Sequence, residues 1–247
     1  MISPVLATTI GPSAYWYLTR ATGAVALLLL TVVVALGVAD VRRWSSPRFP
    51  RFLIDALHRN VALLAVLFLT LHILTTLLDG FAPISLLAAF VPFTSAYRPL
   101  WLGLGAIACD LLIALVASSL LRRHIGHRTW QAIHWCAYAC WPLALVHGFG
   151  TGSDAKSGWL LALSILCIAV VIAAIAGRVW NGTPEHARVR AMAVAATAAF
   201  AVFLAIWLPS GPLGSEWARR AGTPSYLLSH VERSSAAQAG DDGSAER

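Results

Sequence analysis

Residues 55–79 read DALHRNVALLAVLFLTLHILTTLLD, a continuous apolar run that is long enough to cross a bilayer. The run carries two histidines, His58 and His72, fourteen positions apart. A second apolar run, QAIHWCAYACWPLALVHG, carries His134 and His147, thirteen positions apart. An imidazole inside hydrocarbon is costly without a partner, so a histidine within a spanning segment indicates a functional site. Two similarly spaced pairs strengthen that hypothesis.

The whole chain is too apolar for a soluble domain of its length. Of its 247 residues, 58% are hydrophobic and 12% are charged, and the mean hydropathy is +0.72. Six apolar segments are each close to the about 20 residues of a spanning helix, and they lack the alternation of barrel strands. We therefore expect an all-α integral membrane protein, a six-helix bundle. The segments are 15–38, 57–78, 100–121, 131–149, 159–178 and 191–208.

The distribution of arginine and lysine predicts how this bundle is oriented in the cell (plasma) membrane. Eleven of these residues lie in or near the connections after the first, third and fifth segments, and only two lie in the intervening connections. Both termini are therefore expected outside, and the net charge of +7 needs no nucleic-acid partner to explain it. The eleven are Arg42, Arg43, Arg48, Arg51, Arg59, Arg122, Arg123, Arg128, Arg178, Arg188 and Arg190, and the two are Arg98 and Lys156.

Little of the chain remains for a second domain. We expect an outside N-terminal segment at 1–14, the spanning domain at 15–208, and an outside tail at 209–247 that is disordered from about 233, where small and polar residues dominate. Residues 80–99 are apolar but interrupted by prolines, which predicts an interfacial lid on the outer face. Signal-peptide cleavage within the first segment is disfavoured, because the released piece would exceed the usual length of about 15–30 residues.

Several smaller motifs favour structural roles. The cysteines lie in spanning segments without C-x-x-C or C-x-x-C-H spacing, so they predict small buried side chains rather than disulfides or covalent haem. The motif GLGAIA in the third segment nominally fits G-x-G-x-x-A, but a spanning helix favours close helix packing instead of nucleotide binding. Four further histidines are expected in loops: His124, His127, His186 and His230.

The two histidine pairs are expected at two matching depths. At about 1.5 Å of rise per residue, His58 and His72 are about 21 Å apart along their helix, and His134 and His147 about 19.5 Å. Because the second and fourth helices run the same way, His58 is level with His134 near the inner side, and His72 with His147 near the outer side. Two facing neutral imidazoles can fill both axial positions of a haem iron, so the sequence predicts haem sites between these two helices.

Angular spacing places both histidines on one face for the second helix but not for the fourth. At about 100° per residue, His58 and His72 lie about 40° apart around their helix, whereas His134 and His147 lie about 140° apart. A straight helix would not present both of the latter to one neighbour. Pro142 lies between them and removes a backbone hydrogen bond, which permits a kink that re-aims His147.

Four polar residues each have two open interpretations. Asp55 and Gln131 precede the inner histidines by three positions, so each either accepts an imidazole N–H and fixes the ligating tautomer or is simply polar at a helix start. Arg20, near the outer start of the first helix, either snorkels to the interface or neutralises an anionic cofactor group. Asp110, at mid-membrane depth, is either protonated and bonded to a neighbouring helix or takes part in proton or quinone chemistry.

Together these features resemble the ferric reductase-like transmembrane domain, the haem core shared by NADPH oxidases and ferric reductases. The resemblance covers about residues 15–180 and is carried by the H-x13-H and H-x12-H segments, YLTRATG, YRPLWLGLG and RTWQAIHWCAYACWPLALVHG. It implies two haems b, each bound by one histidine of the second helix and one of the fourth. It also implies that Arg20 partners a propionate of the outer haem.

The resemblance implies a diheme transmembrane electron-transfer protein, an oxidoreductase component that moves electrons from an inner donor to an outer acceptor. NADPH oxidases continue into a flavin and NADPH domain, whereas the residues after Arg178 indicate none. We therefore expect a stand-alone version supplied by a separate flavoprotein or iron–sulfur protein, or by quinol. One open alternative is a haem subunit like the one that oxidises quinol and feeds a periplasmic methionine sulfoxide reductase. Another is a transition-metal transporter, since imidazole also binds zinc and copper.

Overall fold

The computed structural model describes residues 13–38, 51–80, 82, 84–152, 155–180 and 187–229. Within these ranges the regular secondary structure is helical and includes no strand. Several sequence predictions lie outside the described residues: the segment 1–12, Arg42, Arg43 and Arg48 of the first connection, His186, His230, and the disordered end from about 233.

Five helices in the described part of the chain are long and apolar enough to cross a membrane. Many of their large apolar side chains face outward, as on the second of them, where Leu63 and Leu78 are each 60% exposed. Lipid stabilises such a surface and water does not, so the prediction of an all-α, multi-pass membrane protein is confirmed. The five are α1 (Ala14–Val38), α3 (Arg51–Leu78), α5 (Pro99–Leu120), α9 (Gly158–Trp180) and α10 (Ala187–Ser210).

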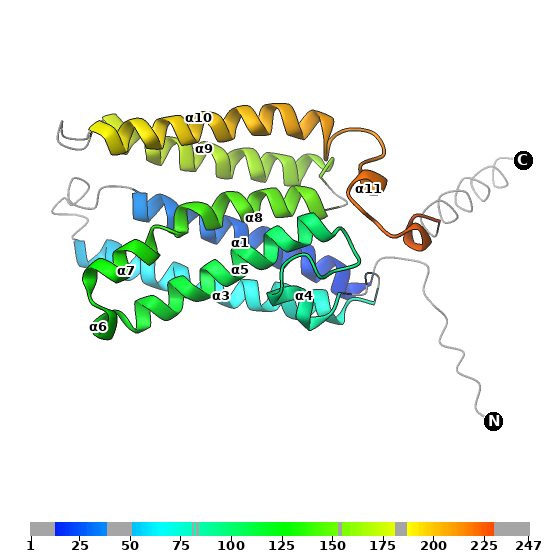
Figure 1. Ribbon diagram of the computed structural model, residues 1–247, viewed down its shortest axis with the longest axis horizontal. Coiled ribbons are helices and arrows are strands. Elements are labelled where there is room, and N and C mark those ends of the chain that lie inside the picture. Colours follow the sequence, from blue (N-terminus) through cyan, green and yellow to red (C-terminus); the bar gives the residue numbers. More distant parts are fainter. Residues whose placement is uncertain are drawn as a thin grey trace, which may run out of the picture.

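The fourth apolar segment differs from the single helix expected there. It is divided into α7 (His127–His134) and α8 (Ala137–Thr151) by a turn at Trp135 and Cys136. Within this turn the amide of Cys136 bonds to the third residue back, Ile133, at 2.9 Å. The two pieces follow one another along α5 (Figure 1), so the segment covers the length of the bundle in two parts.

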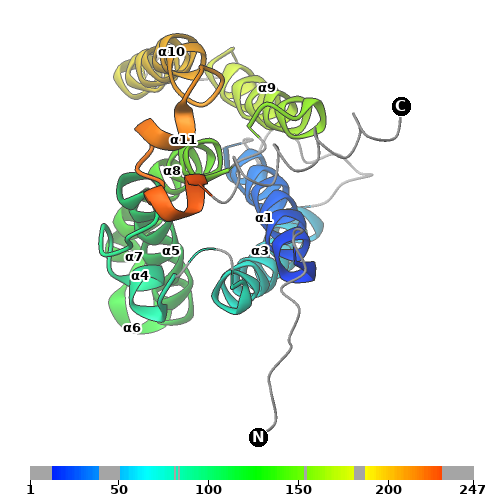
Figure 2. The same ribbon diagram turned by 90° about the vertical axis from the view of Figure 1, so that its right-hand side faces the viewer.

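The long helices alternate in direction, and the described residues begin and end at the same end of the molecule (Figure 1). α1 packs most extensively against α3, and α5 against α8, while α9 lies along α1 and α10 lies beside α9 (Figure 2). Short helices mark the two ends. α4 (Leu86–Phe90) and α11 (Trp217–Arg220) lie at what we call the α4 end, and α6 (Arg122–Ile125) lies with α7 at the α7 end.

The core joins α1 to α8, α9 and α10. Its buried members include Val34, Leu145, Cys167 and Leu204. Two hydrogen bonds tie α1 into this core: the buried Trp141 indole donates to Thr31 Oγ1 at 2.8 Å, and Arg178 donates to the Val38 carbonyl at 3.0 Å. The second bond satisfies a carbonyl at the end of α1 that has no partner within the helix. These contacts hold α1 and α8 in fixed positions beside the histidines.

Candidate functional site

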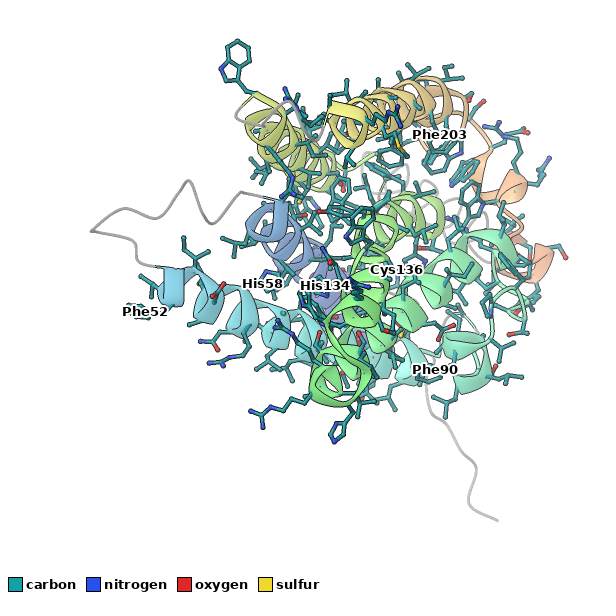
Figure 3. The ribbon with its side chains drawn as sticks, turned by 60° about the vertical axis from the view of Figure 1, so that its left-hand side comes forward. Phe52, His58, Phe90, His134, Cys136 and Phe203 are labelled. Atoms are coloured by element: carbon teal, nitrogen blue, oxygen red, sulfur yellow. The ribbon has the colours of Figure 1, made fainter. Side chains whose placement is uncertain are left out.

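The structure brings the four membrane histidines together as two pairs. His58 of α3 lies beside His134 at the end of α7, with ring centres 6.4 Å apart and ring planes at 57° (Figure 3). His72 of α3 lies beside His147 of α8, also with ring centres 6.4 Å apart, and with ring planes at 86°. These are the two pairs expected from depth along the helices. The first pair is near the α7 end and the second is nearer the α4 end.

Backbone carbonyls fix the tautomer of the second pair. The Nδ1 atom of His72 lies 2.8 Å from the Thr19 carbonyl oxygen, and that of His147 lies 2.9 Å from the Trp101 carbonyl oxygen. A carbonyl only accepts hydrogen bonds, so Nδ1 must carry the proton in both rings. The Nε2 lone pair is therefore free in each, which is the state in which a neutral imidazole binds a metal.

A glycine one helical turn beyond each of these carbonyls makes room for the imidazole. A Cβ at Gly23 would lie 2.9 Å from Nδ1 of His72, and a Cβ at Gly105 would overlap the ring of His147. Thr19 with Gly23, and Trp101 with Gly105, thus form two carbonyl–glycine pairs, each with the carbonyl four residues before the glycine. We call these the carbonyl–glycine pairs of His72 and His147.

A backbone neighbour is also found beside His58, fourteen residues further along α1. The backbone of Val33 is the hydrogen-bonding neighbour of the His58 ring, and a Cβ at Gly37 would be 3.7 Å from its Cε1 atom, an ordinary van der Waals contact. Because α1 and α3 are antiparallel, the fourteen-residue step on α1 matches the fourteen residues between His58 and His72. Sequence reasoning missed these neighbours, although the equal spacing of Gly23 and Gly37 was a visible signal.

The expected partners of the inner histidines are not the ones observed. Asp55 influences His58 only through its charge, since the hydrogen-bonding neighbour of that ring is the backbone of Val33. Gln131 does not bond Nδ1 of His134, which is buried and has no hydrogen-bond partner among the described residues. Of the two interpretations left open for Asp55 and Gln131, the hydrogen-bonding one is therefore not observed, because spacing along one helix considers only local neighbours.

The turn between α7 and α8 explains how His134 and His147 both face α3. A continuous helix would have placed them about 140° apart. The break falls at Trp135 and Cys136, immediately after His134, so the two histidines belong to different helices. Pro142, the residue predicted to permit a kink, lies within α8 between this turn and His147.

A cavity of about 310 Å³ surrounds the His72–His147 pair. Side chains of α1, α3, α5 and α8 form its walls, and Ala82, Ile84, Ala88 and Tyr97 close it at the α4 end. These closing residues belong to the segment that sequence analysis predicted to be a lid. Most of the lining is apolar, and the exceptions include Arg20, Asp79 and the two histidines. The cavity suits a large apolar group that carries a few polar substituents and accepts two imidazole ligands.

Comparison with protein families identifies one match over this part of the molecule. Residues 22–146, about half of the chain, match the ferric reductase like transmembrane component. The chain belongs to this family. The match includes His58, His72 and His134, and it ends one residue before His147. Comparisons with curated proteins and with solved structures found no match.

Members of this ferric reductase-like family generally bind haem, and the histidine pairs fit that group. Two metal–imidazole bonds of about 2 Å, together with the distance from each nitrogen to the centre of its ring, add up to roughly 6 Å. Both pairs have ring centres 6.4 Å apart. Two further features fit haem. The Nε2 lone pairs of His72 and His147 are free, and glycines leave room for both rings.

Arg20 of this ferric reductase-like chain lies at the polar rim of the cavity. Its guanidinium is 4.0 Å from the ring centre of Trp16, and both residues line the cavity. Its charge also acts on Tyr97, another residue of the lining, although burial dominates and raises the pKa of that phenol. The aromatic neighbour expected for a snorkelling arginine is thus present, and so is the access to the cavity that a counter-charge requires.

Arg98 connects the lid to two other parts of the ferric reductase-like chain. Its guanidinium donates to the carbonyls of Gly150 and Thr151 at 3.0 and 3.1 Å, and to Thr223 Oγ1 at 2.9 Å. Burial lowers its pKa, but the ordinary arginine value is so high that it stays charged. The positive φ of 44° at Arg98 is unusual for a non-glycine residue. The hydrogen bonds hold this conformation and bind unpaired carbonyls where α8 ends.

The remaining candidates lie away from both pairs. Asp110 is exposed on the face of α5 that does not line the cavity, and His124 and His127 are exposed at the α7 end. Gly103 and Gly105 confirm the close-packing interpretation of GLGAIA, since a Cβ at these positions would overlap Phe93 and His147. Three of the four cysteines, Cys109, Cys140 and Cys167, are buried as predicted.

Proposed function

We propose that this chain is a diheme b-type electron-transfer protein of the plasma membrane with six spanning segments, α7 and α8 together forming the fourth. His58 and His134 bind one haem, and His72 and His147 bind the other. The observation that carries the proposal is the repetition of one geometry: two histidine pairs, both 6.4 Å between ring centres, contributed by the same two segments. A family that suggests transmembrane electron transfer supports it.

Haem supplies reversible one-electron transfer, and the chain supplies its position and surroundings. Each histidine would supply a neutral imidazole to the iron, and a haem held by two histidines would favour electron transfer over binding of oxygen. The carbonyls of Thr19 and Trp101 orient the rings of His72 and His147 and increase their basicity. Arg20 lines the cavity and would neutralise a propionate of a haem bound there.

The proposed direction is from the α7 end, inside, to the α4 end, outside. Described arginines gather at the α7 end, namely Arg59, Arg122, Arg123, Arg128, Arg178, Arg188 and Arg190. The positive-inside rule places that end in the cytoplasm. Along α3, the fourteen residues between His58 and His72 correspond to about 21 Å. The two haems thus divide the hydrocarbon thickness of about 30 Å into shorter transfers.

The proposed donor is a separate acidic flavoprotein or iron–sulfur protein, or quinol. An acidic donor is complementary to the exposed arginines near His58 and His134. The transition-metal transporter is less well supported. The histidines form pairs at two depths, whereas transport sites usually lie near the midplane, and the described residues contain no cluster of three or more metal-ligating side chains.

Single histidine variants test the ligand assignment. His72→Ala or His147→Ala should remove the haem nearer the α4 end and leave most of the other, so that haem per chain falls by about half. His58→Ala or His134→Ala should remove the other haem. His124→Ala, an exposed histidine outside both pairs, is the control and should keep full content. Full haem content in all four paired variants would show that other residues bind the iron.

A further inference from the structure

Three of the four histidines share one kind of neighbour, and His134 does not. On α1, Thr19 and Gly23 lie beside His72, and the residues fourteen positions further along, Val33 and Gly37, lie beside His58. His147 and His134 are thirteen residues apart, and on α5 Ser118 and Ser119 stand thirteen and fourteen positions after Gly105. The position corresponding to the glycine is therefore occupied by a serine.

Ser119 bonds to the backbone of its own helix and not to Nδ1 of His134. The Ser119 hydroxyl donates to the Leu115 carbonyl at 2.7 Å, and Nδ1 of His134 is buried without a hydrogen-bond partner among the described residues. An aromatic ring lies against His134 instead. The Trp130 ring is stacked on it, with centres 4.8 Å apart and planes at 26°, and the Trp130 indole N–H points to Ser119 Oγ at 3.4 Å.

Trp130 is itself held from two further sides. The Arg122 guanidinium lies 4.3 Å from its ring centre, and the His127 ring is stacked on it at 5.5 Å. The indole is therefore restrained by a cation from α6, a ring from α7 and a hydroxyl from α5. A flat ring restrained in this way limits the plane that the neighbouring His134 imidazole can adopt.

We propose that Trp130 is the positioning residue for His134, replacing the backbone carbonyl that lies beside each of the other three histidines. The proposal rests on the proposed function, because it assigns Trp130 a role towards a haem ligand. It concerns the orientation of the His134 ring and not the chemistry at iron. Ser119 has the secondary role of orienting Trp130.

Electron paramagnetic resonance of the oxidised protein provides the readout, since the low-spin signal of a bis-histidine haem depends on the angle between the two imidazole planes. The angles here are 57° for His58–His134 and 86° for His72–His147, so two distinct signals are expected. Trp130→Leu keeps an apolar side chain but removes the flat ring. Trp130→Leu should shift or broaden the signal of the His58–His134 site and leave the signal of the His72–His147 site unchanged.

Three further variants separate stacking from other effects. Trp130→Phe keeps a ring and should restore a signal close to that of the natural protein, while Ser119→Ala should cause a smaller shift than Trp130→Leu. Trp135→Leu is the matched control, because Trp135 is next to His134 in sequence, is 58% exposed and has no ring contact with it in the described structure.

Two outcomes would contradict different parts of the account. Two haem signals that remain unchanged in Trp130→Leu would overturn the role of Trp130 and leave the proposed function intact. A natural protein without low-spin haem signals would overturn the proposed function, and the role of Trp130 with it. If Trp130→Leu does not fold, Trp130→Phe and Ser119→Ala still decide. Both variants lose the hydrogen bond and keep a ring at position 130, so small shifts of similar size support positioning by stacking, and a much larger shift in Trp130→Phe than in Ser119→Ala would contradict it.

Discussion

At the scale of single residues, Gly23 and Gly105 leave no space for a larger side chain beside the histidines. Gly105→Ala places a methyl group where the ring of His147 lies, and Gly23→Ala places one 2.9 Å from Nδ1 of His72. Since helix backbone is too rigid to move away freely, the imidazole must shift from its carbonyl partner. We expect both variants to lose most of the haem nearer the α4 end, measured as haem per chain in the purified protein.

Gly177→Ala on α9 is the control for these glycine variants. A Cβ there meets no atom within 4 Å, and Gly177 does not line the cavity. Replacing an interior helical glycine by alanine at such a site generally stabilises a helix, so haem content should be unchanged. Full haem content in Gly105→Ala would mean that His147 does not need the space that this glycine leaves.

The sequence predicted which histidines pair but not what surrounds them. Pairing followed from residue counts along helices of known rise, which is a one-dimensional property. The neighbours Thr19, Trp101 and Trp130 depend on the rotation of α1, α5 and α7 about their axes, and tertiary packing determines that rotation. Reasoning from local spacing therefore selected Asp55 and Gln131, which lie on the same helices as the histidines.

At the scale of elements, Arg98 joins the lid, the end of α8 and the segment after α11. Arg98→Ala removes charge-assisted hydrogen bonds to Gly150, Thr151 and Thr223 and leaves an unfavourable backbone conformation unsupported. We expect a loss of about 2 kcal/mol or more in stability, or a fall of about 5 °C or more in the Tm of detergent-solubilised protein. Arg98→Lys keeps the charge but lacks the planar guanidinium, so its Tm should lie between those of the natural protein and Arg98→Ala.

The exposed Arg123 on α6 provides the comparison for Arg98. Arg123→Ala changes a surface cation without a buried partner and should alter stability by less than about 0.5 kcal/mol. Equal Tm values for the Arg98 and Arg123 alanine variants would contradict a structural role for the Arg98 hydrogen bonds.

Loops between helices test the orientation of the bundle. In a background without the four native cysteines, Ala96→Cys in the lid should react with a membrane-impermeant thiol reagent in intact cells, because the α4 end is expected outside. His124→Cys at the α7 end should react only after the cells are opened. Labelling of His124→Cys in intact cells would invert the bundle and reverse the proposed direction of electron transfer.

The helices also show where sequence patterns stop being informative. Hydropathy located the long helices closely, because a run of about 20 apolar residues has few other stable structures in lipid. The break at Trp135 and Cys136 was not predictable, since neither residue is a proline or glycine that would mark it. It becomes intelligible only when His134 and His147 are both required to face α3.

At the scale of the whole molecule, the helical architecture predicts that this chain does not oxidise NADH or NADPH by itself. Nicotinamide binding of the usual kind needs a βαβ unit of roughly 30 residues or more, and the described residues include no strand. The connection between α1 and α3 covers only residues 39–50. We expect no anaerobic haem reduction by NADPH, and reduction after addition of a flavin reductase with NADPH or of a quinol.

The two additions distinguish the donors. Reduction by the reductase system would support a protein donor at the arginine-rich α7 end, and should weaken as salt is raised. Reduction by quinol alone would favour the quinol-oxidising alternative. Rapid reduction by NADPH in the pure protein would contradict the need for a separate donor.

The most direct measurement of the central claim is the dithionite-reduced minus oxidised absorption spectrum of the purified chain, with haem and protein quantified in the same sample. Two histidine pairs with the same distance between ring centres predict about two haems b per chain, both low-spin because two histidines would bind each iron. A colourless protein, or one that retains full haem content after loss of His72 and His134 together, would contradict it.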